Sequence, residues 1–213
     1  MESMQAGLYD VVTLFDGTGF EGWTHKDGSA VGWDLADGVM TVKPGTGNIV
    51  SVETYRDCFL HVEFRCPEMP DATGQHKGNS GVYVQGRYEI QVLDSSGWEV
   101  PGLGDCGAIY NQHAPLVNPC KPGGEWQSYD IIFRAPRFDD AGEMIDDGRL
   151  TVFLNGVLIH NNVEMQGITG GPLDDRVAEP GPLMLQDHRD LVSYRNVWLV
   201  HLPEEGSSEY EPR

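Results

Sequence analysis

Short segments in which apolar and polar residues alternate recur along most of the chain. In the segment 58–66, CFLHVEFRC, every second residue from Cys58 to Cys66 is apolar, and His61, Glu63 and Arg65 lie between them. Because successive side chains of a strand point to opposite faces of a sheet, this pattern predicts a strand with one core face and one polar face.

Similar segments are separated by turn residues throughout. Asp37-Gly38 and Asn155-Gly156 each lie between apolar stretches, which is a typical hairpin signal. No window of 11 or more residues has helical periodicity, so we expect about ten to twelve short strands packed as a β-sandwich or jelly roll. We predict one all-β domain over residues 1–203 and a disordered tail over 204–213.

Two stretches interrupt the strand pattern. Residues 95–124 are rich in Gly, Pro and Asn, and a loop of this length in a compact domain is usually functional or mobile. Residues 136–149 are acidic, and we interpret them as a solvated hairpin loop.

The formal net charge of −19 argues against nucleic acid or an anionic membrane as a partner, since both require a basic surface. The acidity favours solubility, with a calcium site as the alternative, although no D-x-D-x-D-G loop is present. The N-terminal residues show no signal-peptide pattern, and no apolar run reaches the roughly 18 residues needed to cross a bilayer. We therefore expect no membrane insertion.

The four cysteines lack the C-x-x-C spacing of a zinc site. Cys106 and Cys120 bracket a turn-rich stretch and are either bridged or free buried thiols. Cys58 and Cys66 stand at opposite ends of one predicted strand, too far apart to be joined.

Seven short motifs occur in order along the chain: Asn79 to Val82, Tyr88 to Asp94, Gly107 to Tyr110, Lys121 to Trp126, Leu154 to Gly156, Leu185 to His188, and Tyr194 to Asn196. In sequence and spacing they resemble the bacterial 3-keto-disaccharide hydrolase domain family, from about Leu14 to Val200. The resemblance implies a concanavalin A-like jelly-roll sandwich of two antiparallel sheets, with a sugar cleft on a concave face. It also implies a periplasmic or extracellular enzyme that cleaves glycosides oxidised to a ketone at C3.

Such a reaction requires a base to remove the hydrogen at C2, a group that stabilises the enolate oxygen, and an acid for the leaving oxygen. The polar faces of the predicted strands and the loop 95–124 supply candidates for each function. As catalytic residues we predict Glu89, His188 and Arg195, and as residues that bind a glycoside or oligosaccharide Glu63, Gln91, Gln186, Trp98 and Tyr110. We predict no cofactor and no metal in the site.

Most of these side chains also have a purely structural interpretation. Glu63 and Glu89 are placed to pair with Arg65 or Arg87 across strands. His188 is alternatively a structural histidine, and Arg195 a buried clamp on a carboxylate. Trp98 and Tyr110 are alternatively core residues.

Two other functions remain open. Glu89-x-Gln91-x-x-Asp94 superficially resembles the E-x-D-x-x-E strand of laminarinase-like retaining glucanases, but regular pleating places Asp94 on the face opposite to Glu89. The second alternative is a carbohydrate-binding module without activity, since this fold also serves lectins.

Overall fold

The computed structural model describes residues 10–204 and contains fifteen strands and one short 3-10 turn. The strands are β1 (Val11–Phe15), β2 (Trp23–His25), β3 (Asp34–Ala36), β4 (Val39–Thr41), β5 (Ile49–Tyr55), β6 (Cys58–Arg65), β7 (Ser80–Val84), β8 (Tyr88–Val92), β9 (Gln127–Arg134), β10 (Arg137–Phe138), β11 (Met144–Asp146), β12 (Arg149–Leu154), β13 (Val157–Glu164), β14 (Gly181–Leu185) and β15 (Ser193–His201). The 3-10 turn η1 covers Gly74–His76.

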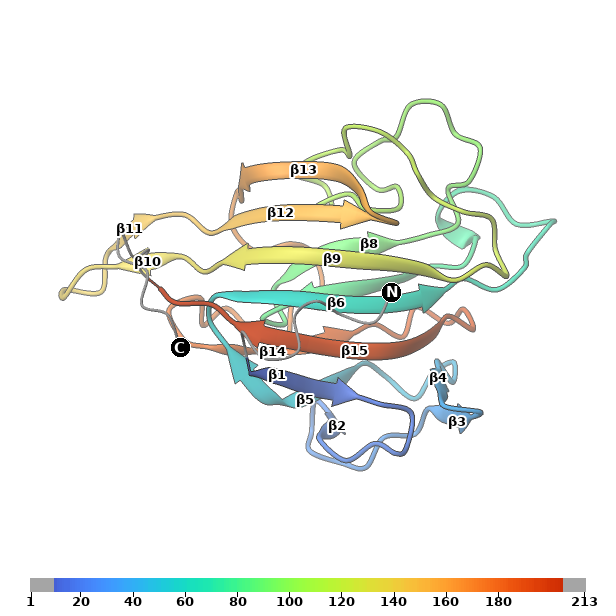
Figure 1. Ribbon diagram of the computed structural model, residues 1–213, viewed down its shortest axis with the longest axis horizontal. Coiled ribbons are helices and arrows are strands. Elements are labelled where there is room, and N and C mark those ends of the chain that lie inside the picture. The colour runs from blue at the N-terminus through green and yellow to red at the C-terminus, as the bar shows by residue number, and fades with distance from the viewer. Residues whose placement is uncertain (1–9, 205–213) are drawn as a thin grey trace.

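Two antiparallel sheets form the layers of the molecule, as Figure 1 shows. The eight-stranded sheet has the order β13-β12-β9-β6-β15-β4-β3, with β1 also paired to β15. The five-stranded sheet has the order β2-β5-β14-β7-β8. The chain is therefore an all-β jelly-roll sandwich, as predicted.

The alternation of the sequence sets the core. Along β6 the residues Cys58, Leu60, Val62 and Phe64 are fully buried, whereas the intervening side chains are half-buried. They join one apolar cluster with inward residues of the five-stranded sheet, among them Val82 and Ile90. Burial of this apolar surface is the main force that holds the sheets together.

Three hairpins are closed by two-residue turns with positive φ. Asp37-Gly38, Gln85-Gly86 and Asn155-Gly156 have φ values between +50° and +77° at both central positions. This is the backbone of the type I′ turn, whose twist matches that of the flanking strands. The two hairpins predicted from Asp37-Gly38 and Asn155-Gly156 are confirmed.

The structure refines the prediction at two loops. Residues 136–149 contain a short hairpin, β10-β11, within the predicted solvated loop. Within the loop 95–124, residues 108–110 run beside β8 and exchange backbone hydrogen bonds with it, from Gln91 N to Ala108 O and from Tyr110 N to Glu89 O.

All four cysteines are free thiols, so the alternative of a bridge between Cys106 and Cys120 does not apply. No helix within residues 10–204 is long and apolar enough to cross a membrane. The predicted tail lies outside the described residues except for Glu204.

Candidate functional site

The outer face of the five-stranded sheet is covered by loops at β7 and β8 instead of facing water. Every residue of β7 and β8 is buried, although only alternate residues face the core between the sheets. Parts of the loop 95–124 and of the segment 165–180 pack over the outward residues of these strands. Polar residues of β8 that would be solvated on an open sheet are therefore enclosed.

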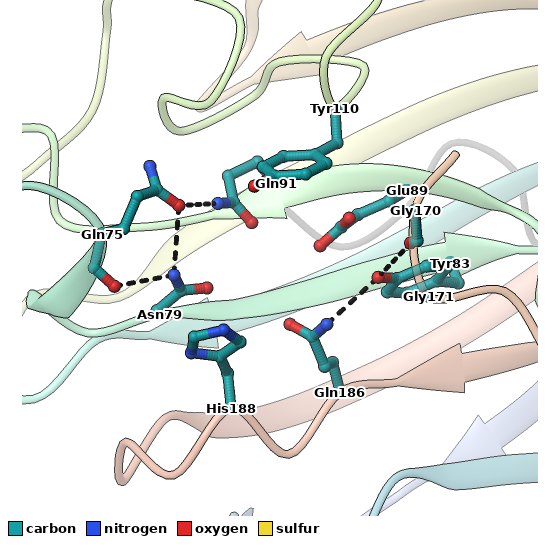
Figure 2. Close-up of a pocket in the computed structure, with 10 residues that line it drawn as sticks. All are labelled: Gln75, Asn79, Tyr83, Glu89, Gln91, Tyr110, Gly170, Gly171, Gln186 and His188. Atoms are coloured by element: carbon teal, nitrogen blue, oxygen red, sulfur yellow. Dashed lines mark hydrogen bonds between the residues drawn. The ribbon is translucent and has the colours of Figure 1, made fainter.

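A cavity of about 260 Å³ lies between this sheet face and its covering loops. Figure 2 shows side chains from β7, β8, the end of β14 and the loops pointing into it. The lining residues are Gln75, Asn79, Tyr83, Glu89, Gln91, Tyr110, Gly170, Gly171, Gln186 and His188. We call it the Glu89 cavity.

Glu89 is the one carboxylic acid in this lining. Its residue is only 3% exposed, and no lysine, arginine or histidine within residues 10–204 forms an ion pair with it. Burial therefore disfavours the charged form and raises the pKa of Glu89 to about 8, although the nearby Tyr83 hydroxyl opposes this effect. A buried carboxyl group with a pKa near neutrality is suited to proton transfer.

A glycine on the neighbouring strand makes room for this carboxyl group. Gly81 stands beside Gln91 in the β7–β8 pairing, and Tyr83 stands beside Glu89. A Cβ atom at position 81 would collide with Oε1 of Glu89 and would lie 2.8 Å from Cε2 of Tyr83. The Glu89 carboxyl group is thus folded across Gly81, which fixes its position on the cavity floor.

Three amide side chains form a hydrogen-bonded wall at one end of the cavity. Nε2 of Gln91 donates to Oε1 of Gln75 (2.9 Å), and Nδ2 of Asn79 donates to the same atom (3.2 Å) (Figure 2). Gln75 is itself anchored by a bond from its Nε2 to Gly104 O (2.7 Å). These bonds hold the amides in fixed orientations before any ligand arrives.

Two buried oxygen atoms of the cavity lining have no hydrogen-bond partner in the part of the chain that the structure describes. They are Oε1 of Gln91 and Oε1 of Gln186, and both residues line the cavity. Leaving a buried acceptor unpaired costs about 1 to 3 kcal/mol, so such atoms are normally paired with protein, water or ligand. Here they offer acceptors to the hydroxyl groups of a polyol.

The opposite wall is held by a buried arginine. Arg87, 1% exposed, donates from Nε to Oδ1 of Asp174 (2.8 Å) and from Nη1 to Glu179 O (2.8 Å). Thr169 binds both Arg87 O and the backbone N–H of Glu89 (2.8 Å). These contacts position Gly170, whose carbonyl accepts a hydrogen bond from the Tyr83 hydroxyl (2.9 Å).

His188 and Tyr110 complete the site at its rim. His188 is exposed and follows Asp187, whose Oδ2 accepts hydrogen bonds from Gly45 N (2.7 Å) and Gly47 N (2.9 Å). Tyr110 is half-buried and lies beside Glu89 through the bond between their backbones. Within residues 10–204, neither the His188 ring nor the Tyr110 hydroxyl has a hydrogen-bond partner, so both are free to bind a ligand.

The structure brings together five of the eight predicted site residues and separates the other three. Glu89, Gln91, Gln186, His188 and Tyr110 share the cavity. Glu63 and Arg195 lie in the eight-stranded sheet instead, because β6 pairs with β15 there. The expectation that they would lie beside Glu89 is therefore wrong. Arg195 donates from Nε to Oε2 of Glu63 (2.6 Å), a contact that resembles the carboxylate clamp given above as its structural interpretation.

Two further predictions concern residues near β8. Trp98 is 40% exposed and does not line the Glu89 cavity, so it is not positioned to stack on a sugar there. Asp94 lies apart from Glu89 and is bound by Nζ of Lys77 (3.1 Å) and Gly123 N (3.1 Å). A retaining glucanase needs a second carboxylate about 5 to 5.5 Å from the first, and the cavity lining supplies none.

Sequence reasoning missed Gln75, Asn79, Tyr83 and the glycines Gly170 and Gly171. Asn79 lies within a family-like motif, and Tyr83 alternates with apolar residues in β7, so the sequence weakly indicated a role in the site for both. Gln75 and the two glycines lie in irregular segments, where no sequence pattern indicated such a role. Within residues 10–204 no group of three or more His, Cys, Asp or Glu side chains is arranged to hold a metal ion.

Comparisons with known proteins agree with this architecture. A candidate glycosyl hydrolase from Parabacteroides distasonis is 36% identical, with a TM-score of 0.82 over 91% of this chain and 84% of its own. A second structure from the same organism is 21% identical, with a TM-score of 0.68 over 95% of this chain and 99% of its own, and shows the fold alone. The chain has no match among curated proteins. Residues 10–200 match the family model described as a 3-keto-alpha-glucoside-1,2-lyase-like domain, and the chain therefore belongs to this family of glycosyl hydrolase-like, carbohydrate-active domains.

Proposed function

We propose that the protein cleaves 3-keto-glycosides in the Glu89 cavity, by elimination of the group at C1 followed by addition of water. The observation that carries this proposal is Glu89 itself, a buried carboxyl group with a pKa of about 8 and without a cationic partner among residues 10–204. The chain's family is described by a lyase activity on 3-keto-alpha-glucosides, which supports the same chemistry.

A ketone at C3 makes the hydrogen at C2 acidic. In its ionised form Glu89 takes this proton, and the electrons of the C2–H bond pass into an enolate between C2 and C3. The enolate then expels the oxygen at C1, leaving a double bond between C1 and C2. Because burial raises the pKa of Glu89, its ionised form is a stronger base than an exposed carboxylate.

The other free groups of the cavity fit the remaining steps. The hydroxyl of Tyr110, beside Glu89, donates a hydrogen bond to the enolate oxygen, and His188 at the exposed rim protonates the leaving oxygen. Water then adds to C1 and passes its proton to His188, and Glu89, whose proton has exchanged with solvent, protonates C2. Oε1 of Gln91 and Oε1 of Gln186 accept hydrogen bonds from the sugar hydroxyls.

The size of the cavity indicates which part of the substrate it encloses. A volume of about 260 Å³ lies just below the usual range for small-molecule pockets, so we assign it to a single sugar ring. The group attached at C1 then projects past His188 toward solvent, which predicts cleavage at a terminal residue and not within a polymer.

Comparison of an oxidised with an ordinary substrate tests this function. We expect the purified protein to release p-nitrophenol from p-nitrophenyl 3-keto-α-glucoside, above the rate without protein, and to leave p-nitrophenyl α-glucoside intact. The ordinary glucoside lacks the acidic hydrogen at C2 and cannot follow the elimination path. Cleavage of the ordinary glucoside alone would refute the proposal, and binding of both without release of p-nitrophenol would favour a carbohydrate-binding module.

A further inference from the structure

The eight-stranded sheet carries a second hollow on its outer face, away from the Glu89 cavity. It is open, has a volume of about 400 Å³, and is lined by His61, Glu63, Lys121, Trp126, Gln127, Ser128, Asn155 and Arg195. Segments far apart in the sequence meet here: the start of β9, the turn after β12, and the middle of β6 and β15. Several of them belong to the family-like motifs that the Glu89 cavity does not use, including Trp126, Asn155 and Arg195.

A bulge in β15 shapes the hollow. Consecutive residues of a strand normally point to opposite faces, but the pairing with β6 shifts between Arg195 and Trp198, and Asn196 has a φ of +47°. Arg195 and Asn196 therefore both reach Glu63, through Nε to Oε2 (2.6 Å) and Nδ2 to Oε1 (2.9 Å). This arrangement fixes the Arg195 guanidinium group, which also lies 4.0 Å from the centre of the Trp126 ring.

The carboxylate and amide oxygen atoms of the hollow are already occupied. Glu63 uses both oxygen atoms as described, Oδ1 of Asn155 accepts from Ser128 N (3.1 Å), and Oε1 of Gln127 accepts from Lys121 N (2.8 Å). Nδ1 of His61 is bonded to Oδ1 of Asp130 (2.6 Å). A ligand that offers only hydroxyl donors would therefore find few free partners.

The donors of the hollow are largely unused. Across residues 10–204, no acceptor is bonded to either Nη of Arg195, to Nε1 of Trp126 or to the Ser128 hydroxyl. Lys121 donates from Nζ to Trp126 O (3.0 Å) and retains two hydrogens. Arg65 adds a third positive charge, 4.8 Å from the Trp126 ring centre. Three of the fourteen lysines and arginines thus gather at one place on a protein of net charge −19.

Because the donors of this hollow are largely free while its carboxylate and amide oxygen atoms are occupied, we infer that the hollow is a binding site for an oxyanion, namely a carboxylate, sulfate or phosphate group. The free Nη groups of Arg195 match the paired oxygen atoms of such a group, and Lys121, which also lines the hollow, supplies a second positive charge. The ligand is either the free ion or an acidic sugar that carries the group, and the Glu89 cavity, with its unpaired acceptors, is not suited to either.

Isothermal titration calorimetry of the whole protein tests the site. The ligands are sulfate, phosphate, methyl glucuronide and, as a neutral control, methyl glucoside, at constant ionic strength. We expect saturable binding of the anions, weakened about tenfold by Lys121→Gln and by Arg195→Lys, which keeps the ion pair to Glu63 but removes the Nη donors. Lys43→Gln, an exposed lysine elsewhere, is the matched control and leaves binding unchanged.

The relative affinities identify the source of the oxyanion. Equal affinity for sulfate, phosphate and glucuronide indicates a site for the free ion, and tighter binding of glucuronide indicates an acidic sugar. Release of p-nitrophenol from the 3-keto-glucoside should be unchanged in Lys121→Gln, which separates this site from the Glu89 cavity. Absence of saturable anion binding, or binding that neither variant weakens, would overturn the inference.

Discussion

Glu89→Gln should lower kcat/KM for the 3-keto-glucoside by about 10²- to 10⁴-fold, the range for loss of a general base. Glutamine has nearly the same shape but cannot accept the proton from C2. In the wild-type protein kcat/KM should rise with pH as Glu89 ionises, with an inflection near its pKa of about 8. The residual activity of the variant should lack this inflection.

The same variant should be more stable than the wild type in mildly alkaline solution. The pKa of Glu89 is raised from 4.5 to about 8 by folding, so its ionisation opposes folding progressively as the pH rises between these values. The glutamine of the variant does not ionise and carries no such cost, and at pH 8 we expect a gain on the order of 4 kcal/mol in the free energy of unfolding. Urea unfolding at pH 5 and pH 8 measures it; equal gains at both values would contradict the pKa assignment.

Arg87→Met should destabilise the fold by about 3 to 5 kcal/mol, the usual cost of breaking a buried ion pair. Burial acts to raise the pKa of Asp174, yet hydrogen bonds from Arg87 and Arg176 lower it to about 2. The pair therefore stabilises the fold above pH 4, and this contribution is lost as the pH falls toward 2. Urea unfolding at pH 7 and pH 3 should show a larger difference between wild type and variant at pH 7.

An exposed ion pair provides the control for this variant. Arg149 contacts Oε2 of Glu164 at 2.6 Å, but its side chain is 29% exposed, and Arg149→Met should cost less than about 1 kcal/mol.

Arg87→Met should also lower kcat on the 3-keto-glucoside at temperatures where the protein is folded, because the segment that carries Gly170 loses its anchor. Full activity together with unchanged stability would show that Arg87 does not hold this wall.

Local sequence patterns predicted the fold because each strand must bury alternate side chains. The strand at 58–66 and the turns at Asp37-Gly38 and Asn155-Gly156 follow from residue periodicity and backbone preference alone. Residues 136–149 were predicted as a solvated hairpin loop, but its strands β10 and β11 were not predicted, because they bury too little apolar surface to leave a periodic signal. The pairing of residues 108–110 with β8 was missed because it depends on distant chain segments.

The candidate site was only partly predictable for a related reason. Alternation along 58–66 and 193–201 indicates that Glu63 and Arg195 leave the core face, but not which of the two sheets they belong to. Both strands pair in the eight-stranded sheet, where Arg195 stands opposite Glu63 and the bulge turns Asn196 to the same face. Conversely, Glu89, Gln91 and Gln186 met as expected, because β8, β7 and β14 are neighbours in the other sheet.

Cleavage of the 3-keto-glucoside in D₂O tests the central claim most directly, since elimination and direct hydrolysis differ at one hydrogen. If Glu89 removes the proton from C2 and water is added afterwards, the released sugar should carry one deuterium at C2, detected by NMR against a blank without protein. Glu89→Gln should slow cleavage and exchange together, by about 10²- to 10⁴-fold. Release of a 3-keto sugar that retains its original hydrogen at C2 would show direct displacement at C1 and would contradict the role assigned to Glu89.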